Sequence, residues 1–151
     1  MRTVDRIAVH APVEDVFRIA AQVERWPDFL SHYRWVRVRE RSAGRCTVEM
    51  AAWRPFGIFR YHTRWVSRME IDAAGHAVRY RHIEGITLGM EVEWSLHARA
   101  DNVEIVIVHE WNGPAWPLIG PLAAELVIGP VFIHGIASRT LAGVKRRAEA
   151  A

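Results

Sequence analysis

Cysteine and lysine are nearly missing from this sequence. Its 151 residues include one cysteine, Cys46, and among the 20 side chains of lysine and arginine only Lys145 is a lysine. A single cysteine excludes an internal disulfide, and no cysteine–histidine spacing matches a zinc site. We therefore expect a protein of a reducing compartment that holds neither a metal nor an organic cofactor.

A secretory signal is also missing, since residues 1–6 contain no apolar stretch, and the expected location is the cytoplasm. One run, 117–137, is apolar except for Glu125 and His134, and its length alone would suit a transmembrane helix. The Gly-Pro pairs at 120–121 and 129–130, together with Glu125, are costly in lipid. We predict two buried helices that are broken at Gly129-Pro130, and no membrane partner.

Positive charge is not gathered into one patch. The net charge is only +3, although the isoelectric point is near 9.6. The arginines alternate with apolar residues along predicted strands, which argues against nucleic-acid binding. Two interpretations stay open for these outward arginines, a solvated sheet face or a surface that steers an acidic carrier protein. The rows comprise Arg37, Arg39, Arg60, Arg64, Arg68, Arg79 and Arg81.

Half of the residues are hydrophobic, which excludes a disordered chain or a coiled-coil rod. The length predicts a single domain over 1–151. Periodicity predicts a helix from Pro130 to the end, with an apolar stripe at Ile133, Ala137, Leu141, Val144 and Ala148. It also predicts a strand at 2–9, helices beginning near 11–17 and at 23–30, and strands at 34–41, 45–53, 57–69, 76–84, 87–98 and 102–111.

This order of elements predicts the α+β class. A seven-stranded, curved antiparallel sheet is expected to wrap around the long C-terminal helix, with two short helices after the first strand. Such an arrangement tends to leave a cavity between the sheet and the helix. The sequence therefore favours a pocket-forming architecture.

Strand alternation predicts which side chains face this cavity, because successive residues point to opposite sides of a sheet. The inward set is rich in tryptophan and tyrosine and has few hydroxyl and imidazole groups, as in pockets for small molecules. A packed core is the alternative. The inward set comprises Phe59, Tyr61, Thr63, Trp65, Ser67, Met69, Val78, Tyr80, His82, Leu88, Met90, Val92, Trp94, Leu96, Val103, Ile105, Ile107 and His109.

His109 is the main candidate for chemistry, because an inward imidazole can move a proton near neutral pH. A neutral core histidine is the alternative. His82 ranks below it, and His134 lies beside the stripe of the C-terminal helix, at a cavity edge or on the surface. Ser67 lacks the base and acid that a nucleophile needs, so we expect it to form a hydrogen bond in the core.

At the level of motifs, the chain resembles the START/Bet v 1-like (SRPBCC) superfamily, and within it the polyketide cyclase/dehydrase branch, over nearly its whole length. The resemblance implies a helix-grip fold with a deep hydrophobic cavity. It rests on Ala11-Pro12-x-x-x-Val16-Phe17, on 24–30 with Tyr33, on Trp65-Val66-Ser67-Arg68, on Glu84-Gly85, on Met90-x-x-x-Trp94 and on Thr140-Leu141-x-x-Val144-Lys145.

The resemblance also implies roles for single residues. Trp26 and Tyr33 match a tryptophan–tyrosine pair of aromatase/cyclase pockets. His109 matches a histidine that some of these enzymes use, and Ile136 stands where some members carry an acid. Trp65 and Ser67 match a Trp-x-Ser-x-Arg strand, but Met69 replaces its inward arginine. Arg68 points outward unless a β-bulge shifts the strand.

Two functions from different classes remain. The first is a polyketide cyclase, aromatase or dehydratase that closes a poly-β-ketone chain delivered by an acyl carrier protein, with His109 as general base and Tyr33 and Ser67 holding oxygens. The second is a non-catalytic carrier of a lipid, quinone or isoprenoid, which Met69 and Ile136 favour. Substrate contacts are expected from Trp26, Tyr61, Trp65, Met69, Tyr80, Met90, Trp94 and His134.

A third hypothesis is a membrane-associated lipid handler that uses 117–137. The sequence leaves the identity of the hydrophobic ligand open. It also leaves open whether the protein forms a homodimer.

Overall fold

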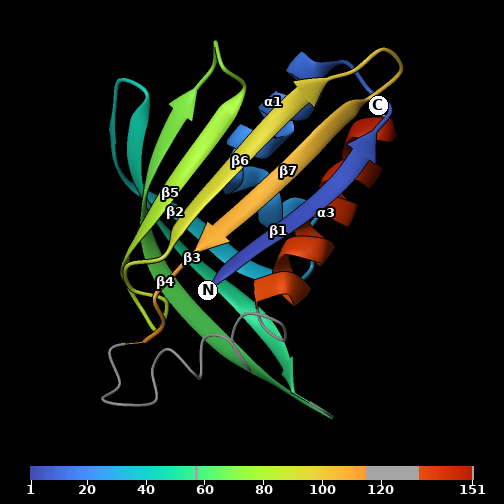
Figure 1. Cartoon of the computed structure of the whole chain (residues 1–151). Helices are drawn as coiled ribbons and strands as arrows, with labels where there is room; N and C mark the ends of the chain where they lie inside the picture. The colour runs from blue at the N-terminus through green and yellow to red at the C-terminus, as the bar shows by residue number, and fades with distance from the viewer. Residues whose placement is uncertain (57, 115–132, 151) are drawn as a thin grey trace.

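A computed structural model describes residues 1–56, 58–114 and 133–150, apart from the side chains of residues 54–56, 59 and 61. Seven antiparallel strands form one sheet in the order β1-β7-β6-β5-β4-β3-β2 (Figure 1). The sequence therefore folds as a meander from β2 to β7, with β1 paired to β7. The strands are β1 (Arg2–Val9), β2 (Tyr33–Ser42), β3 (Arg45–Phe56), β4 (Phe59–Asp72), β5 (Ala77–Glu84), β6 (Glu91–Ala98) and β7 (Val103–Glu110).

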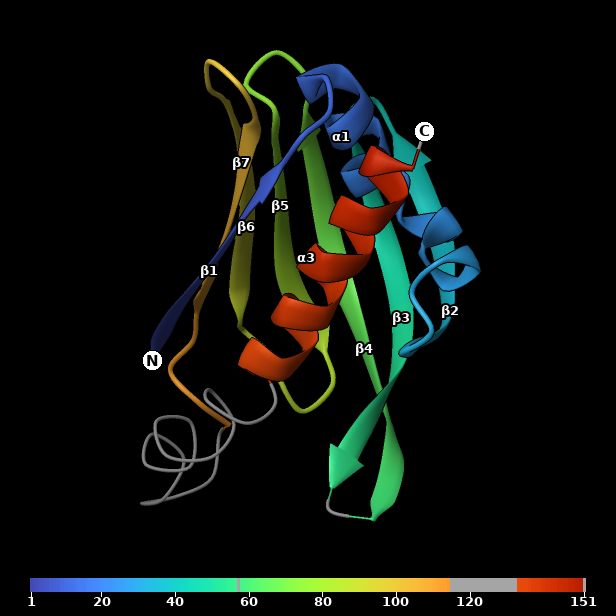
Figure 2. The same ribbon diagram turned by 90° about the vertical axis from the view of Figure 1, so that its right-hand side faces the viewer.

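Three helical elements cover one face of this sheet (Figure 2). They are α1 (Val13–Ala21), the short 3-10 helix η1 (Val23–Asp28) and the long α3 (His134–Glu149). The predicted stripe of α3 is buried, including Ala137, Leu141 and Val144. This confirms the α+β class and the sheet wrapped around a C-terminal helix. The predicted start at Pro130 and the predicted helix before Gly129-Pro130 lie outside the described residues.

Alternation is confirmed along β4. Trp65, Ser67 and Met69 are buried under the helices, whereas Arg64 and Arg68 are exposed on the opposite face. An irregularity does occur here, because Val66 pairs with Glu84 while the next residue pairs with His82. The extra residue therefore belongs to β5, and Arg68 keeps its outward position.

The predicted strand at 87–98 is wrong at its beginning. β6 starts only at Glu91, and residues 85–90 form a loop in which Gly85 and Gly89 have φ of 106° and 86°. Such positive φ values suit glycine. Leu88 sits in this loop and is 57% exposed, so its predicted inward position is also wrong.

Over the described parts of the chain, no helix combines the length and the apolar character that crossing a membrane requires.

Candidate functional site

A cavity of about 70 Å³ lies between the inner face of the sheet and α3. Its wall brings together most of the side chains that the sequence assigned to a pocket. Because a water molecule occupies roughly 30 Å³ of liquid, this space holds about two waters. Small-molecule pockets are several times larger, so a ligand of that size requires the wall to open. The assigned residues on the wall are Trp26, Tyr33, Trp65, Tyr80, Met90, Trp94 and His109.

Aromatic rings form one side of this cavity. The Trp26 ring lies 5.3 Å from the Tyr33 ring in an edge-on contact and 5.5 Å from the Trp94 ring. The Trp26 indole N–H donates to the Ile19 carbonyl over 3.2 Å, which links η1 to α1. Tyr33 also contacts Trp65 at 6.2 Å. Aromatic contacts of this kind contribute about 0.5–1.5 kcal/mol each beyond burial, so the wall is held in shape.

Polar groups stand in a row across three neighbouring strands. Tyr80 of β5 pairs with Val92 of β6, which pairs with His109 of β7. The two polar side chains are thus two strand spacings apart, roughly 10 Å, with the valine between them. Within the described chain, no group accepts or donates a hydrogen bond at the buried Tyr80 hydroxyl. Burial raises the pKa of Tyr80 well above its usual value, with Tyr33 adding to the effect, so the phenol keeps its proton.

His82 is held in the cavity wall by contacts that its position in the sequence did not predict. Its Nδ1 lies 2.6 Å from Thr87 Oγ1, and its ring stacks on Trp65 at 6.0 Å. The backbone also ties the loop to this residue, because His82 N donates to Met90 O and Gly89 N donates to His82 O, both over 2.9 Å. Thr87 was missed because the sequence predicted it as the first residue of a strand at 87–98, whereas it lies in the loop before β6.

Glycine is required at the start of this loop. A side chain on Gly85 would place its Cβ only 2.8 Å from the Arg64 carbonyl oxygen, in addition to the positive φ. The close approach lets 85–90 fold back over β4 and bring Thr87 to His82. The Glu84-Gly85 pair was part of the sequence resemblance, but nothing in it indicated a contact with Thr87.

Ser67 and Met69 are buried on the inner face but do not line the cavity. The described residues offer the Ser67 hydroxyl no hydrogen-bond partner, although we expected one. Met69 lies against Cys46, with 3.7 Å between the sulfur atoms. The Tyr61 side chain lies outside the described part. Ile136 does line the cavity, and so does Ile107 of the predicted inward set. The wall also includes Met50, Thr87, Ile133, Ala137 and Thr140, which the sequence did not assign to the site.

His134 lies away from the cavity wall. It is the first residue of α3, its side chain is 63% exposed, and its Nδ1 is paired with the Asp5 carboxylate of β1. Asp5 itself is buried, and within the described residues its second oxygen has no hydrogen-bond partner. His134 therefore anchors the start of α3 to the edge of the sheet.

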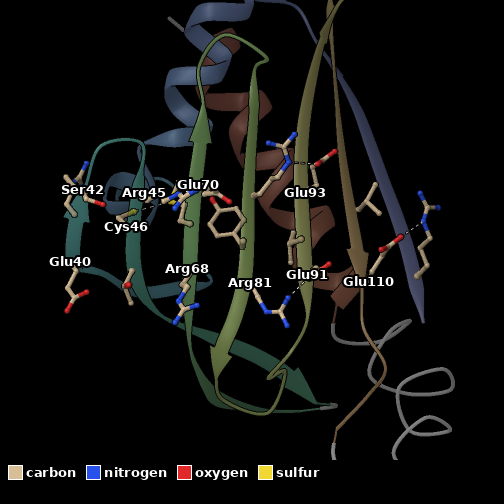
Figure 3. Close-up of a pocket in the computed structure, with 18 residues that line it drawn as sticks. Glu40, Ser42, Arg45, Cys46, Arg68, Glu70, Arg81, Glu91, Glu93 and Glu110 are labelled. Carbon is tan, nitrogen blue, oxygen red and sulfur yellow. Dashed lines mark hydrogen bonds and ion pairs between the residues drawn. The ribbon is translucent and has the colours of Figure 1, made fainter.

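The outer face of the sheet carries a shallow depression of about 940 Å³ with charged walls (Figure 3). Most of its arginines face an acid directly across the strand pairing, as Arg81 does with Glu91 at 2.7 Å and Arg45 with Glu70 at 3.1 Å. Such opposite-charge pairs compensate each other. Arg68 differs, because the residues opposite it are Thr47 and Arg81.

A denser charge network lies where β2, β3 and β4 meet. Glu49 accepts hydrogen bonds from Arg39 at 2.8 Å and from Arg64 at 2.6 Å, and Glu84 lies 3.6 and 3.5 Å from the same two arginines. The Arg64 hydrogen bond, supported by Arg39, lowers the pKa of Glu49. These outward arginines are therefore neutralised by their neighbours, as a solvated sheet face requires.

No metal centre was found in the described ranges, which contain no group of three or more histidine, cysteine or acidic side chains placed to hold an ion.

Protein structures with the same fold are numerous. A protein of Thermus thermophilus is 21% identical, with a TM-score of 0.83 over 99% of this chain and 98% of that one. The Zhui aromatase/cyclase from Streptomyces sp. R1128 is 22% identical, with a TM-score of 0.82 over 99% and 93% of the chains.

A START superfamily protein from Mycobacterium smegmatis is 16% identical, with a TM-score of 0.73 over 99% of this chain and 97% of that one. At these identities the likeness shows the helix-grip fold alone. No curated protein sequence matches the chain. The family model described as "Polyketide cyclase / dehydrase and lipid transport" matches residues 9–129. The chain therefore belongs to this SRPBCC/START-like family of polyketide cyclases, dehydrases and lipid transport proteins, which bind hydrophobic small molecules.

Proposed function

We propose that the protein is a cyclase or dehydratase that binds a poly-β-ketone chain or an aromatic polyketide intermediate between the sheet and α3. This proposal rests on the row of Tyr80, Val92 and His109. The row places the neutral phenol of Tyr80 and the imidazole of His109 on either side of the apolar Val92 side chain. The aromatic side of the cavity suits flat, partly cyclised intermediates. The resemblance adds an acyl carrier protein as the partner that delivers the chain.

In this mechanism, His109 accepts a proton from a carbon that lies between two ketones. The resulting enolate carbon attacks the carbon of a third ketone farther along the chain, and the imidazolium returns the proton to the new alkoxide oxygen. Loss of that hydroxyl with a neighbouring proton releases water and gives the double bond. Tyr80 keeps its proton at neutral pH and can donate a hydrogen bond to the enolate oxygen, and Tyr33 borders the same space.

The tryptophans contribute to this mechanism by shaping the cavity. Trp26, Trp65 and Trp94 come from η1, β4 and β6, so their rings bound the cavity from different elements. A flexible ketone chain can cyclise in several ways, and a wall of fixed shape favours the conformer that brings one pair of carbons together. Ser67 lies behind this wall and would reach the substrate only if the cavity opened.

A carrier of a hydrophobic ligand is the second candidate, and one observation favours it. Met69 is buried on the inner side while Arg68 points outward, so the arginine that cyclases of this branch aim at a substrate oxygen is replaced by an apolar side chain. Removing that charge makes the inner face more apolar. A carrier would need no proton transfer from His109.

The test uses a synthetic tetraketide thioester and compares His109→Phe with His82→Phe, because both imidazoles lie on the wall. We expect His109→Phe to lower the rate of cyclised product formation by about 10²–10⁴-fold, the range for losing a general base. His82→Phe should retain most of the rate. A wild-type protein that binds the thioester without turning it over would support the carrier. Equal rates for wild type and His109→Phe would refute the role of His109.

A further inference from the structure

A further pocket, of about 360 Å³, lies between α3 and the end of the sheet at which β3 and β4 meet. The turn before β2, the end of β3, the beginning of β4 and the middle of α3 all contribute to it. Its described lining includes no acidic side chain but has three arginines. The residues are Leu30, Ser31, His32, Trp53, Arg60, Arg139, Ala142 and Arg146. We call it the arginine pocket.

The three arginines of this pocket differ from the arginines of the sheet that are paired with acids. On the outer sheet face, arginines such as Arg79 and Arg81 lie 2.7 Å from a glutamate. Within the described chain, by contrast, Arg60, Arg139 and Arg146 form no ion pair with an acid. Their like charges repel each other, and a bound anion would remove this repulsion.

Trp53 fixes one wall of the arginine pocket. The guanidinium carbons of Arg34 and Arg60 lie 4.7 and 4.6 Å from the centre of its ring. Cation–π contact of this kind stabilises a guanidinium without neutralising its charge. Arg60 is thereby held at the pocket while its N–H groups remain available to a ligand.

The opposite wall is fixed by close packing on α3. A Cβ on Gly143 would overlap the Leu30 side chain, so glycine lets the turn at 30–32 lie directly on the helix. His32 Nε2 is 2.9 Å from Thr140 Oγ1, and Trp53 N donates to His32 O over 2.7 Å. The pocket is therefore built from segments whose relative positions are already set by buried contacts.

The arginine pocket also adjoins the inner cavity. Thr140 lines the cavity and His32 lines the pocket, so their hydrogen bond is part of the partition between the two spaces. The two spaces are nevertheless distinct, because the described linings of the pocket and the cavity have no residue in common.

We propose that the arginine pocket is a binding site for a phosphate group, either as free phosphate, as a phosphate ester or as a lipid headgroup. Three guanidinium groups offer forked N–H donors that match phosphate oxygens, and arginine suits such recognition better than lysine does. A phosphate dianion also compensates more of the positive charge than one carboxylate can.

The test titrates protein labelled with ¹⁵N-arginine, in a phosphate-free buffer, with inorganic phosphate and with phenyl phosphate. We expect saturable shifts of the Arg139 and Arg146 Nε–H signals. In Arg139→Gln and Arg146→Gln the affinity should fall at least about tenfold, as loss of a charge-assisted hydrogen bond implies. Arg68→Gln is the matched control, since Arg68 is exposed, lies on the outer sheet face and carries the same charge.

A parallel arm measures co-sedimentation with phosphatidylcholine vesicles that contain or lack phosphatidic acid. Loss of binding in the two pocket variants but not in Arg68→Gln supports the site, with soluble phosphates indicating a small molecule and vesicles indicating a lipid headgroup. Equal losses in all three variants would show a general charge effect and overturn the proposal. So would the absence of saturable binding to every probe. Thermal unfolding of each variant controls for folding.

Discussion

At the scale of single residues, Gly143 shows how one missing side chain positions two sites. It is buried in α3, and Leu30 occupies the space that a Cβ would take. Leu30 begins the turn that leads to His32, which lines the arginine pocket, and to Tyr33, which lines the cavity. The aromatic wall of the cavity and the arginine pocket thus depend on the same close contact.

We predict opposite effects of alanine at two glycines of α3. Gly143→Ala should lower the free energy of unfolding by about 1–2 kcal/mol, because overpacking exceeds the gain in helix propensity. Gly135→Ala is the control. Among the described residues, no atom beyond its chain neighbours and its own helix backbone lies within 4 Å of the point where its Cβ would stand, so alanine should stabilise the helix by up to about 1 kcal/mol. Thermal unfolding measures both. Equal stabilisation by the two changes would contradict the packing argument.

Sequence reasoning at this scale succeeded where alternation decides direction. It placed Met69 inward and Arg68 outward, and the bulge left both directions unchanged because the extra residue lies in β5. It misplaced Leu88, since residues in a glycine loop follow no period of two. It ranked His82 below His109 because of the arginine-rich outer row beside it, and it did not predict the contact with Thr87 of that loop.

At the scale of elements, the strands β2, β3 and β4 are joined by charge as well as by backbone hydrogen bonds. Glu49 of β3 lies between Arg39 of β2 and Arg64 of β4, and its carboxylate is almost buried. The lowered pKa of Glu49 means that the folded state prefers the ionised form. This contribution to stability is complete above the ordinary pKa near 4.5 and is lost as the pH falls through the lower folded value.

We therefore predict that Glu49→Gln weakens the acid sensitivity of the fold. At neutral pH the variant should lose about 1 kcal/mol, because glutamine keeps a neutral hydrogen bond in place of a charged one. Below pH 4.5 the difference from the wild type should shrink. Chemical denaturation at several pH values measures it, with the exposed pair of Arg81 and Glu91 supplying the control Glu91→Gln. A difference that is constant from neutral to acid pH would contradict the assignment.

The arginine pocket could not be predicted from the sequence, because it depends on how whole elements pack together. Arg60 follows the β3–β4 turn, whereas Arg139 and Arg146 are far along the chain on α3. Only the packing of the helix across the sheet brings them together. The sequence analysis grouped Arg60 with the outward-facing arginines of the strands, and in the structure most of those arginines form ion pairs with acids.

At the scale of the whole molecule, the fold separates two kinds of surface. The outer sheet face carries matched opposite charges, and the inner face carries aromatic rings with a few polar groups under α3. The sequence predicted this division because both strand alternation and the helix stripe have clear periods. It could not predict the size of the cavity, which depends on how the helix and the loop at 85–90 close over the wall.

The central claim is that a polyketide-like ligand binds over the row of Tyr80, Val92 and His109. The most direct measurement is NMR of ¹³C-methyl-labelled valines during titration with a polyhydroxylated naphthalene. We predict saturable shifts and intermolecular contacts at the Val92 methyls, while Val48, which is buried outside the cavity wall, stays unchanged. Saturable binding that leaves Val92 unperturbed would place the ligand elsewhere and contradict the account.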